Sequence, residues 1–181
     1  MLVLECECRR FCGLVKKRGV MQSRFLPFKI LGIHHIAIAS EDGVDGDMSQ
    51  FLRDLLGLDF LGEEAVHAEK THTSFFASAH EDVSKSGLKE HAKTQLEIIS
   101  PLDSSGVVAK FLAKRGAGIH HLAFKVDDID SAVIYLKEQG VRLVHNVPRQ
   151  GAHGTRVVFI HPKSSGGVLV ELVEDPRTAQ S

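Results

Sequence analysis

The sequence predicts an α+β fold in which two βαβββ repeats close one curved, barrel-like mixed sheet around a metal cleft. The motif Gly-Ile-His-His-Ile-Ala-Ile-Ala at residues 32–39 returns as Gly-Ile-His-His-Leu-Ala-Phe-Lys-Val at residues 118–126. The two copies are 86 residues apart, which is the length of one such unit, and a similar pattern of helix and strands follows each. Because one unit cannot bury its sheet face alone, the two are expected to share one core.

The first repeat, residues 31–101, is expected to begin with the strand at 32–39 and to continue with a helix at 48–56. Apolar residues at positions 48, 51, 52, 55 and 56 fall on one helical face, and Gly57 ends the pattern. Three strands are expected next, at 58–61, 73–77 and 94–100. The polar stretch 78–93 is expected to form an exposed loop.

A linker helix at 106–115 is expected to connect the first repeat to the second, residues 118–175. There a strand at 120–126 leads into a helix at 127–139, which Gly140 ends. The remaining strands are expected at 141–145, 156–160 and 167–174. Residues 176–181 are expected to form a tail.

The composition is that of an ordinary globular protein. Of the 181 residues, 43% are hydrophobic and 25% are charged, and the formal net charge is -1. This balance provides no general attraction to nucleic acid or anionic membranes, and no apolar run reaches the roughly 18 residues of a membrane-spanning helix. All three cysteines lie in the first twelve residues, which argues against an internal disulfide framework and for a reducing compartment. We therefore expect neither nucleic acid nor a membrane as a partner.

Residues 1–29 differ from the rest because they are basic and poor in acids. Seven Lys and Arg residues, interspersed with apolar ones, stand against Glu5 and Glu7. This composition is typical of a mitochondrial transit peptide, so we expect the mitochondrial matrix and a domain that begins at residue 30 without need of this segment. A disordered basic tail on a cytoplasmic protein is the alternative, and Met21 is a second possible start.

Strand alternation assigns one histidine of each pair to a shared interior. Successive side chains of a strand point to opposite faces. His120 therefore falls on a bulky apolar face suited to packing under a helix, whereas His121 falls on the face of Ala123. In the first copy His35 falls likewise beside Ala37. A metal site between the repeats requires such a pair, and two core histidines bonded to backbone are the alternative.

Two further polar residues occupy strands that should be central, Gln95 at the start of 94–100 and Glu171 within 167–174. A carboxylate in the middle of an apolar strand is costly to bury unless it is paired or bound to a cation. With His35 and His121 these residues would offer two imidazoles, a carboxylate and an amide oxygen to a divalent ion. Such a set leaves open positions for two substrate oxygens. An amide bonded to backbone is the alternative for Gln95.

The paired repeats with His-Ile-Ala-Ile, His-Leu-Ala-Phe and Val-Leu-Val-Glu-Leu resemble the vicinal oxygen chelate superfamily, which includes glyoxalase I and extradiol dioxygenases. From residue 94 onward the chain is similar to the methylmalonyl-CoA epimerases of that superfamily. The similarity lies in Ala-Lys-Arg-Gly-Ala-Gly-Ile-His-His-Leu-Ala-Phe-Lys-Val-Asp-Asp-Ile-Asp, Gly-Ala-His-Gly and Phe-Ile-His-Pro-Lys-Ser-Ser-Gly-Gly-Val-Leu-Val-Glu-Leu. The resemblance covers roughly residues 31–175.

The resemblance implies a set of site residues. The metal ligands would be His35, Gln95, His121 and Glu171. The family also carries a catalytic glutamate in a Pro-Glu-Gln-Gly-like turn, and Glu69 takes its place here in Val66-His-Ala-Glu-Lys-Thr. The proline, glutamine and glycine of that turn are absent, and Glu63 and Glu64 are the nearby alternatives.

The resemblance also implies an activity. The family interconverts the C2 epimers of methylmalonyl-CoA, so the chain would be an isomerase with Glu69 and Glu171 as an acid/base pair on opposite faces of a thioester enolate. A divalent ion (cobalt, manganese, zinc or magnesium) and a homodimer are expected with it. The alternatives are a glyoxalase I-like lyase, an iron-dependent extradiol dioxygenase, against which Gln95 counts, and a non-catalytic ligand-binding protein of the same fold.

Overall fold

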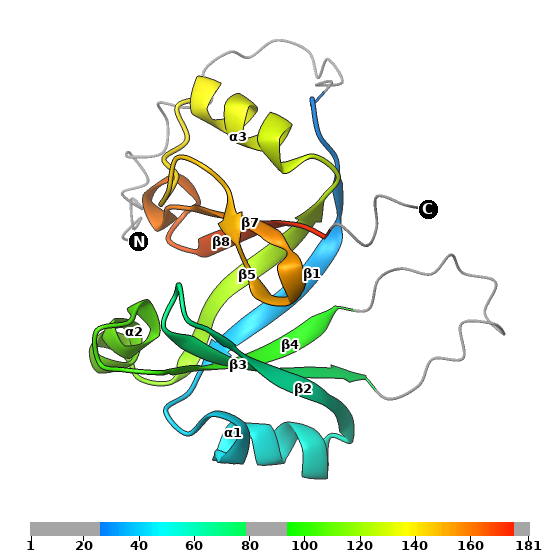
Figure 1. The fold of residues 1–181 in the computed structure, drawn as a ribbon, viewed down its shortest axis with the longest axis vertical. Helices are drawn as coiled ribbons and strands as arrows, with labels where there is room; N and C mark the ends of the chain where they lie inside the picture. The colour runs from blue at the N-terminus through cyan, green and yellow to red at the C-terminus, as the bar shows by residue number, and fades with distance from the viewer. Residues whose placement is uncertain (1–25, 79–93, 176–181) are drawn as a thin grey trace, which may run out of the picture.

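The computed structural model describes residues 26–78 and 94–175 of the chain (Figure 1). Most of the predicted segment 1–29, nearly all of the predicted loop 78–93 and the tail 176–181 lie outside the described residues, so those predictions stay predictions. Within the described ranges, no helix is long and apolar enough to cross a membrane.

The first repeat begins with β1 (Ile30–Ala39), followed by the short helical segments η1 (Gly43–Asp45), α1 (Asp47–Gln50) and η2 (Phe51–Leu55). Because η2 is a π-helical turn, the predicted helix 48–56 is present with a widened end. Gly57, at φ +68°, adopts the left-handed conformation that lets the chain leave the helix. Three strands follow: β2 (Leu58–Val66), β3 (Thr71–Ser78) and β4 (Gln95–Pro101).

Helix α2 (Val107–Arg115) links the repeats, and the second repeat continues through β5 (Gly118–Val126) and α3 (Ile129–Glu138). The side chain of Asp128 caps α3 by accepting a hydrogen bond of 2.9 Å from the backbone nitrogen of Ser131. The remaining elements are β6 (Arg149–Gln150), η4 (Ala152–Gly154), β7 (Arg156–Ile160), η5 (Pro162–Ser164) and β8 (Leu169–Glu174).

The predicted strand at 141–145 is wrong. This segment forms a single bridge, between Leu143 and Ile160, and the short strand beside β7 is β6 instead. The physical reason is packing, because Leu143 is buried in the apolar cluster under α3 and Val141 packs against that cluster. Apolar packing, and not pairing with a neighbouring strand, therefore determines the path of this segment.

The eight strands within the described ranges form one sheet in the order β2-β3-β4-β1-β5-β8-β7-β6. The two motif strands, β1 and β5, pair antiparallel at the centre. On its other side each pairs in parallel with the last strand of its own repeat, β1 with β4 and β5 with β8. The repeats are thus related by an approximate two-fold axis between β1 and β5, and the predicted fold class is confirmed (Figure 1).

Separate apolar clusters join each repeat's helix to its strands. In the second repeat, Ile129 and Val133 of α3 pack with Leu172 of β8. In the first repeat, Leu52 of η2 packs with Ile98 of β4. These contacts hold the outer face of the sheet at both ends and leave the inner face for the site.

Phe28 belongs to the α3 cluster although it precedes the predicted domain. Its side chain is 7% exposed, and its ring meets that of Tyr135 at a centroid distance of 6.1 Å. The backbone nitrogen of Lys29 also donates a hydrogen bond to Asp127. The packed domain therefore includes residues on the N-terminal side of the predicted boundary at residue 30.

The central pair of strands departs from regular alternation at both histidine pairs. The β1–β5 ladder shifts register between Ile33 and His35, and again between Ala37 and Ile38. The pairing skips His34 on β1 and His120 on β5, so each is the extra residue of a β-bulge. A bulge changes the direction of the side chains around it. The approximate two-fold axis relates the bulge at His34 to the bulge at His120, so the same distortion occurs at both histidine pairs.

Candidate functional site

A cavity of about 190 Å³ lies on the inner face of the sheet and is built by both repeats. Alternate residues of the central strands line it, as the pleat of a strand requires. On β4 these are Gln95, Glu97 and Ile99, and on β8 they are Leu169, Glu171 and Val173. The residues between them, such as Ile98 and Leu172, face the helices.

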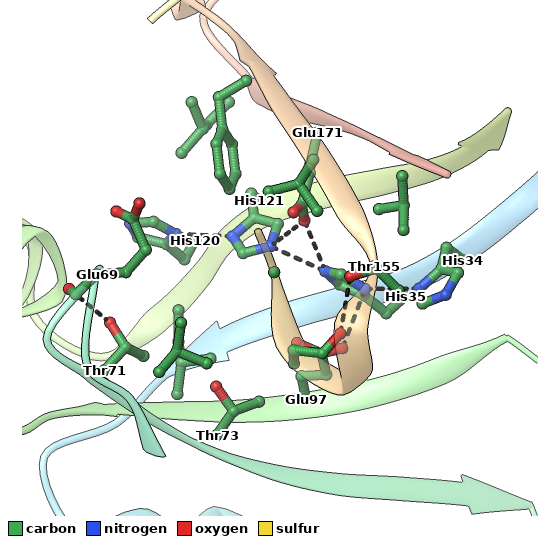
Figure 2. A pocket seen from close by; sticks show the side chains of 18 of the residues that line it. His34, His35, Glu69, Thr71, Thr73, Glu97, His120, His121, Thr155 and Glu171 are labelled. Atoms are coloured by element: carbon green, nitrogen blue, oxygen red, sulfur yellow. Dashed lines mark hydrogen bonds and ion pairs between the residues drawn. The ribbon is translucent and has the colours of Figure 1, made fainter. Parts of the chain in front are cut away.

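His35, His121 and Glu171 meet inside this cavity (Figure 2). The Nε2 atoms of the two histidines are 2.9 Å apart, and the Oε2 of Glu171 lies 3.0 Å from each of them. All three residues are at most 7% exposed. The predicted convergence of His35 and His121 is therefore confirmed, and the predicted Glu171 completes the group.

Glu171 carries the negative charge of this group. Burial by itself would raise the pKa of Glu171, but the adjacent imidazoles of His121 and His35 outweigh burial and lower this pKa to about 2. The side chain of Glu171 is therefore a carboxylate at neutral pH. Its Oε2 is buried and accepts no well-directed hydrogen bond within the described part of the chain. A buried, incompletely satisfied carboxylate oxygen next to two ring nitrogens is costly unless a cation or a proton lies between them.

The triangle of three atoms fits a divalent metal ion. Nitrogen and oxygen ligands lie about 2.1 Å from such ions, so two ligands at right angles are about 3.0 Å apart. The sides of this triangle, 2.9, 3.0 and 3.0 Å, match three adjacent corners of an octahedron. Two imidazoles and a carboxylate on one face leave the opposite positions free for other oxygens.

Strand β4 brings two oxygen-bearing side chains to the same face, Gln95 and Glu97. Gln95 is half-buried, lines the cavity and stands directly opposite His35 in the β1–β4 ladder. Glu97 is 7% exposed, and its Oε1 lies 3.0 Å from the Nδ1 of His35. Burial raises the pKa of Glu97, whereas the negative charges of Glu97 and Glu171 outweigh burial at His35 and leave its pKa raised.

The approximate two-fold axis identifies the counterpart of Glu171 in the first repeat. The β5–β8 ladder pairs Glu171 with Ala123, two residues beyond the inner histidine. The β1–β4 ladder pairs Glu97 with Ala37, also two residues beyond the inner histidine. Glu97 is therefore the residue that symmetry relates to Glu171.

The prediction that only one histidine of each pair faces the interior is wrong. His34 and His120 also line the cavity, because the bulges break the alternation on which that prediction depended. Burial lowers the pKa of each to about 4, so both are neutral near pH 7. His120 does contact a helix as predicted, since the ring of Phe111 on α2 stands edge-on to it at a centroid distance of 4.8 Å.

Glu69 lies in the turn between β2 and β3 and lines the cavity. Its Oε1 is 3.4 Å from Nη1 of Arg149, and the hydroxyl of Thr71 donates a hydrogen bond to its backbone oxygen. Glu63 and Glu64, the two alternatives, do not line the cavity in the described residues, and Glu63 faces His72 at 3.7 Å. Of the three glutamates, Glu69 alone is placed to reach a molecule in the cavity.

Residues 151–155 of the second repeat reach across the cavity to the first repeat. Glu64 accepts a hydrogen bond of 2.9 Å from the backbone nitrogen of His153 and lies 3.2 Å from its Nδ1. The imidazole packs on the ring of Phe75 at a centroid distance of 4.4 Å. These contacts hold His153 at φ +52°, a left-handed conformation uncommon for residues other than glycine. Together with the pair formed by Arg149 and Glu69, they join the two outer edges of the sheet around the cavity.

The expectations from the sequence do not include several of these residues: Glu97, the outer histidines as cavity residues, Arg149 and His153. A signal for Glu97 was present, because Leu-Glu-Ile-Ile at 96–99 repeats the pattern of Val-Glu-Leu-Val at 170–173. Nothing comparable announces the contacts of Arg149 and His153, since they form between segments that are distant in the chain.

Comparisons with known proteins agree with this geometry. Residues 34–159 match the family described as the Glyoxalase/Bleomycin resistance protein/Dioxygenase superfamily. The chain is 37% identical over 128 residues to the uncharacterized protein YqjC of Bacillus subtilis. The aligned region covers 71% of this chain and 82% of that protein. It is 34% identical over 146 residues to the mitochondrial methylmalonyl-CoA epimerase of Mus musculus, with 80% of this chain and 74% of that protein covered.

A solved structure is similar over nearly the same region. The methylmalonyl-CoA epimerase from Mycobacterium tuberculosis superposes with a TM-score of 0.71 at 37% identity, over 89% of this chain and 97% of that one. The chain therefore belongs to the glyoxalase/bleomycin resistance protein/dioxygenase superfamily and, within it, to the family of methylmalonyl-CoA epimerases.

Proposed function

We propose that this protein epimerises methylmalonyl-CoA at C2. The observation that carries the proposal is the buried group of His35, His121 and Glu171 within a cavity that both repeats build, in a chain of this family. The substrate has two oxygens flanking C2, one on the thioester and one on the carboxylate. A divalent ion held from one side by three protein ligands retains open positions for such a pair.

The metal ligands in this proposal are His35, His121 and Glu171, with a fourth donor from β4. The resemblance implies Gln95, whereas burial and the two-fold relation to Glu171 favour Glu97, which we propose for this position. When bound, the ion would stabilise the negative charge that develops on the thioester oxygen as the C2 proton leaves. Metal analysis decides among cobalt, manganese, zinc and magnesium.

Glu69 and Glu171 are the proposed acid/base pair. One carboxylate takes the proton from C2, and the electron pair of the broken C–H bond passes into the thioester carbonyl. The other group, in its protonated form, then donates a proton to C2 from the opposite face. Support for two different faces comes from their origins, since Glu69 lines the cavity from the β2–β3 turn of the first repeat and Glu171 from β8 of the second.

The position of the buried group indicates which part of the substrate would lie beside it. The oxygens flanking C2 would have to reach His35, His121 and Glu171, so we propose that the acyl group with its carboxylate occupies this part of the cavity.

Proton exchange at C2 tests the proposal. NMR in D2O follows the C2 proton of methylmalonyl-CoA with the purified protein, with protein treated with a chelator, and with each of the four ions restored. We expect exchange and epimerisation to fall with the chelator and to return with at least one ion. Absence of exchange with all four ions would refute the activity, and exchange that the chelator leaves unchanged would refute the metal.

The alternatives have their own outcomes in the same experiment. Turnover of a hemithioacetal of methylglyoxal, without exchange at C2 of the thioester, would identify a glyoxalase I-like lyase. Saturable binding of methylmalonyl-CoA without any turnover would identify a ligand-binding protein of this fold.

We also propose localisation in the mitochondrial matrix and a homodimer. The basic, acid-poor composition of residues 1–29 supports the first, and import of a fluorescent fusion into mitochondria tests it. Exposed apolar side chains support the second, because Leu55 is 76% and Leu56 55% exposed at the end of the first helix, and Phe60 and Leu61 of β2 are exposed as well. Light scattering of the purified protein gives the mass that decides.

A further inference from the structure

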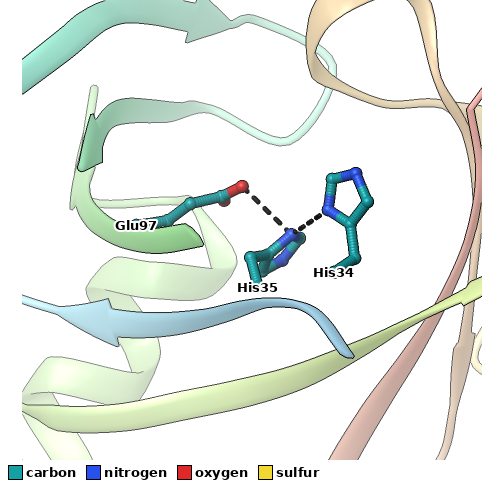
Figure 3. A group of neighbouring side chains, drawn as sticks. All are labelled: His34, His35 and Glu97. Carbon is teal, nitrogen blue, oxygen red and sulfur yellow. Dashed lines mark hydrogen bonds and ion pairs between the residues drawn. The ribbon is translucent and has the colours of Figure 1, made fainter. Parts of the chain in front are cut away.

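The site contains two pairs of histidines, and the outer member of each pair stands in the same relation to the inner one. The Nδ1 of His34 lies 2.9 Å from the Nδ1 of His35, and the Nδ1 of His120 lies 2.9 Å from the Nδ1 of His121. The ring centroids are 5.2 Å apart in both pairs, with interplanar angles of 78° and 77°. Figure 3 shows the pair on β1 with Glu97 beside it. Repetition of one geometry in two places points to one role.

We propose that His34 and His120 are positioning residues that hold the rings of His35 and His121 in the tautomer and orientation needed to bind a metal ion. In each pair the inner Nδ1–H donates a hydrogen bond to the outer Nδ1, and the inner Nε2 keeps its lone pair for the ion. This inference rests on the metal site of the proposed function and concerns residues outside the ligand set.

The chemistry of imidazole makes such an acceptor necessary. A neutral imidazole has one N–H and one lone pair, so a ring that binds an ion through Nε2 carries its proton on Nδ1. His35 and His121 both turn Nε2 toward Glu171, at 3.0 Å. Both rings are buried, and a buried N–H without an acceptor is costly. Partners of this kind fix the orientation of metal-bound histidines in proteins.

His120 provides the clearer case of the two. Among the described contacts, the Nδ1 of His121 has one hydrogen-bonding partner, which is His120. The Nδ1 of His35 has two, His34 at 2.9 Å and Glu97 at 3.0 Å. If Glu97 turns toward an ion as its fourth ligand, His34 is the acceptor that remains.

The bulges make this arrangement possible. In a regular strand, neighbouring side chains point to opposite faces, so two consecutive histidines would not meet. The skipped positions at His34 and His120 bring each outer ring to the same side as its neighbour. On β5 the ring of Phe111 packs edge-on against His120 and limits its rotation. The doubled histidine and the bulge thus form one device, present once in each repeat.

Cobalt binding to the full-length protein tests the inference. His120→Leu removes the acceptor and keeps an apolar side chain of similar reach, whereas His120→Asn places an amide oxygen where the histidine has Nδ1. Cobalt(II) affinity is measured by competition with a chelator, and the visible absorption spectrum of bound cobalt reports the geometry of its ligands. We expect His120→Leu to bind cobalt about 10–100-fold more weakly with an altered spectrum, and His120→Asn to recover most of both.

His72→Leu is the matched control. His72 lies on β3 between Thr71 and Thr73, which line the cavity, but it does not line the cavity itself. The same substitution there is expected to leave cobalt affinity and spectrum unchanged, and thermal unfolding of each apo form separates lost binding from lost folding. If His120→Leu does not fold, His120→Asn decides alone, with retained affinity supporting the inference and lost affinity overturning it.

The outcomes separate this inference from the proposed function. Wild-type affinity and spectrum in a folded His120→Leu protein would overturn the role of His120 while leaving the metal site intact. Equal weakening in folded Leu and Asn variants would do the same. A wild-type protein that binds no divalent ion would overturn the proposed metal site, and this inference with it.

Discussion

Replacement of Glu69 by glutamine removes a base and leaves almost everything else in place. Glutamine has the same shape and keeps an oxygen toward Arg149, whose Nη1 lies 3.4 Å from Oε1 of Glu69. The side chain of Arg149 is 46% exposed, so this pair contributes little to folding and the free energy of unfolding should change by less than about 0.5 kcal/mol. A positioned acid/base group contributes about 10²–10⁴-fold in rate. The expected loss of transition-state stabilisation is therefore about 2.7–5.4 kcal/mol.

The assay follows one purified epimer of methylmalonyl-CoA, with chiral analysis for epimerisation and NMR in D2O for proton exchange. We expect epimerisation to fall by the factor given above and bound metal to stay at the wild-type level. Exchange of one epimer can persist, because Glu171 would still serve the other face. Glu63→Gln is the matched control, since Glu63 lies on the preceding strand, faces His72 and does not line the cavity. Normal epimerisation by Glu69→Gln would refute the assignment and return the role to Glu63 or Glu64.

Three further perturbations test the ligand set and the fold. Glu97→Ala is expected to weaken divalent-ion binding at least about tenfold in calorimetric titration and Gln95→Ala to leave it nearly unchanged, and the opposite order would restore Gln95 as the fourth ligand. Asp128→Ala removes the cap of α3 and is expected to cost about 1 kcal/mol of unfolding free energy in urea at neutral pH. Hydrogen bonds from Ser131 lower the pKa of Asp128 in the folded protein. The stabilisation by the cap is therefore fully present above the unfolded pKa of about 3.9 and is lost as the pH falls through the lowered, folded-state pKa. A difference in unfolding free energy between wild type and Asp128→Ala that persists in strong acid would contradict this explanation. The sequence alone predicts that a chain beginning at Lys29 suffices, but such a chain lacks the buried Phe28. We expect its unfolding free energy to be about 3 kcal/mol lower than that of a chain beginning at Leu26. Equal urea midpoints of the two chains would show that the packing of Phe28 is dispensable.

Most of the fold could be predicted because its determinants are local or repeated. The motif that recurs after 86 residues defines the two units, and Gly57 and Gly140 end the helices where they were expected to end. The one strand predicted in error, 141–145, contains Leu143, whose apolar side chain serves the α3 cluster instead of a ladder. An apolar residue shows in the sequence that it will be buried but does not show against what.

The central part of the site was likewise determined by the sequence alone. Alternation along single strands assigned His35 and His121 to the interior, and the cost of burying a carboxylate in an apolar strand pointed to Glu171; the structure brings these three residues together. The sequence also contained the repeated pattern that relates Glu97 to Glu171, yet the polarity of Gln95 at the start of its strand drew the prediction to that residue.

Only the tertiary structure decided the rest. Alternation is a property of one strand, whereas register and bulges are properties of a pair of strands. β1 and β5 pair with each other although most of the first repeat separates them in the sequence. The skipped positions in that pairing turn His34 and His120 toward the cavity against the expectation from alternation. The contacts of His153 with Glu64 and Phe75 depend in turn on the closure of the whole sheet, which brings its two edges within reach of each other. The residue types that carry the chemistry can thus be recognised in short stretches of sequence, but the distances between these residues are set by strand pairing and by closure of the sheet.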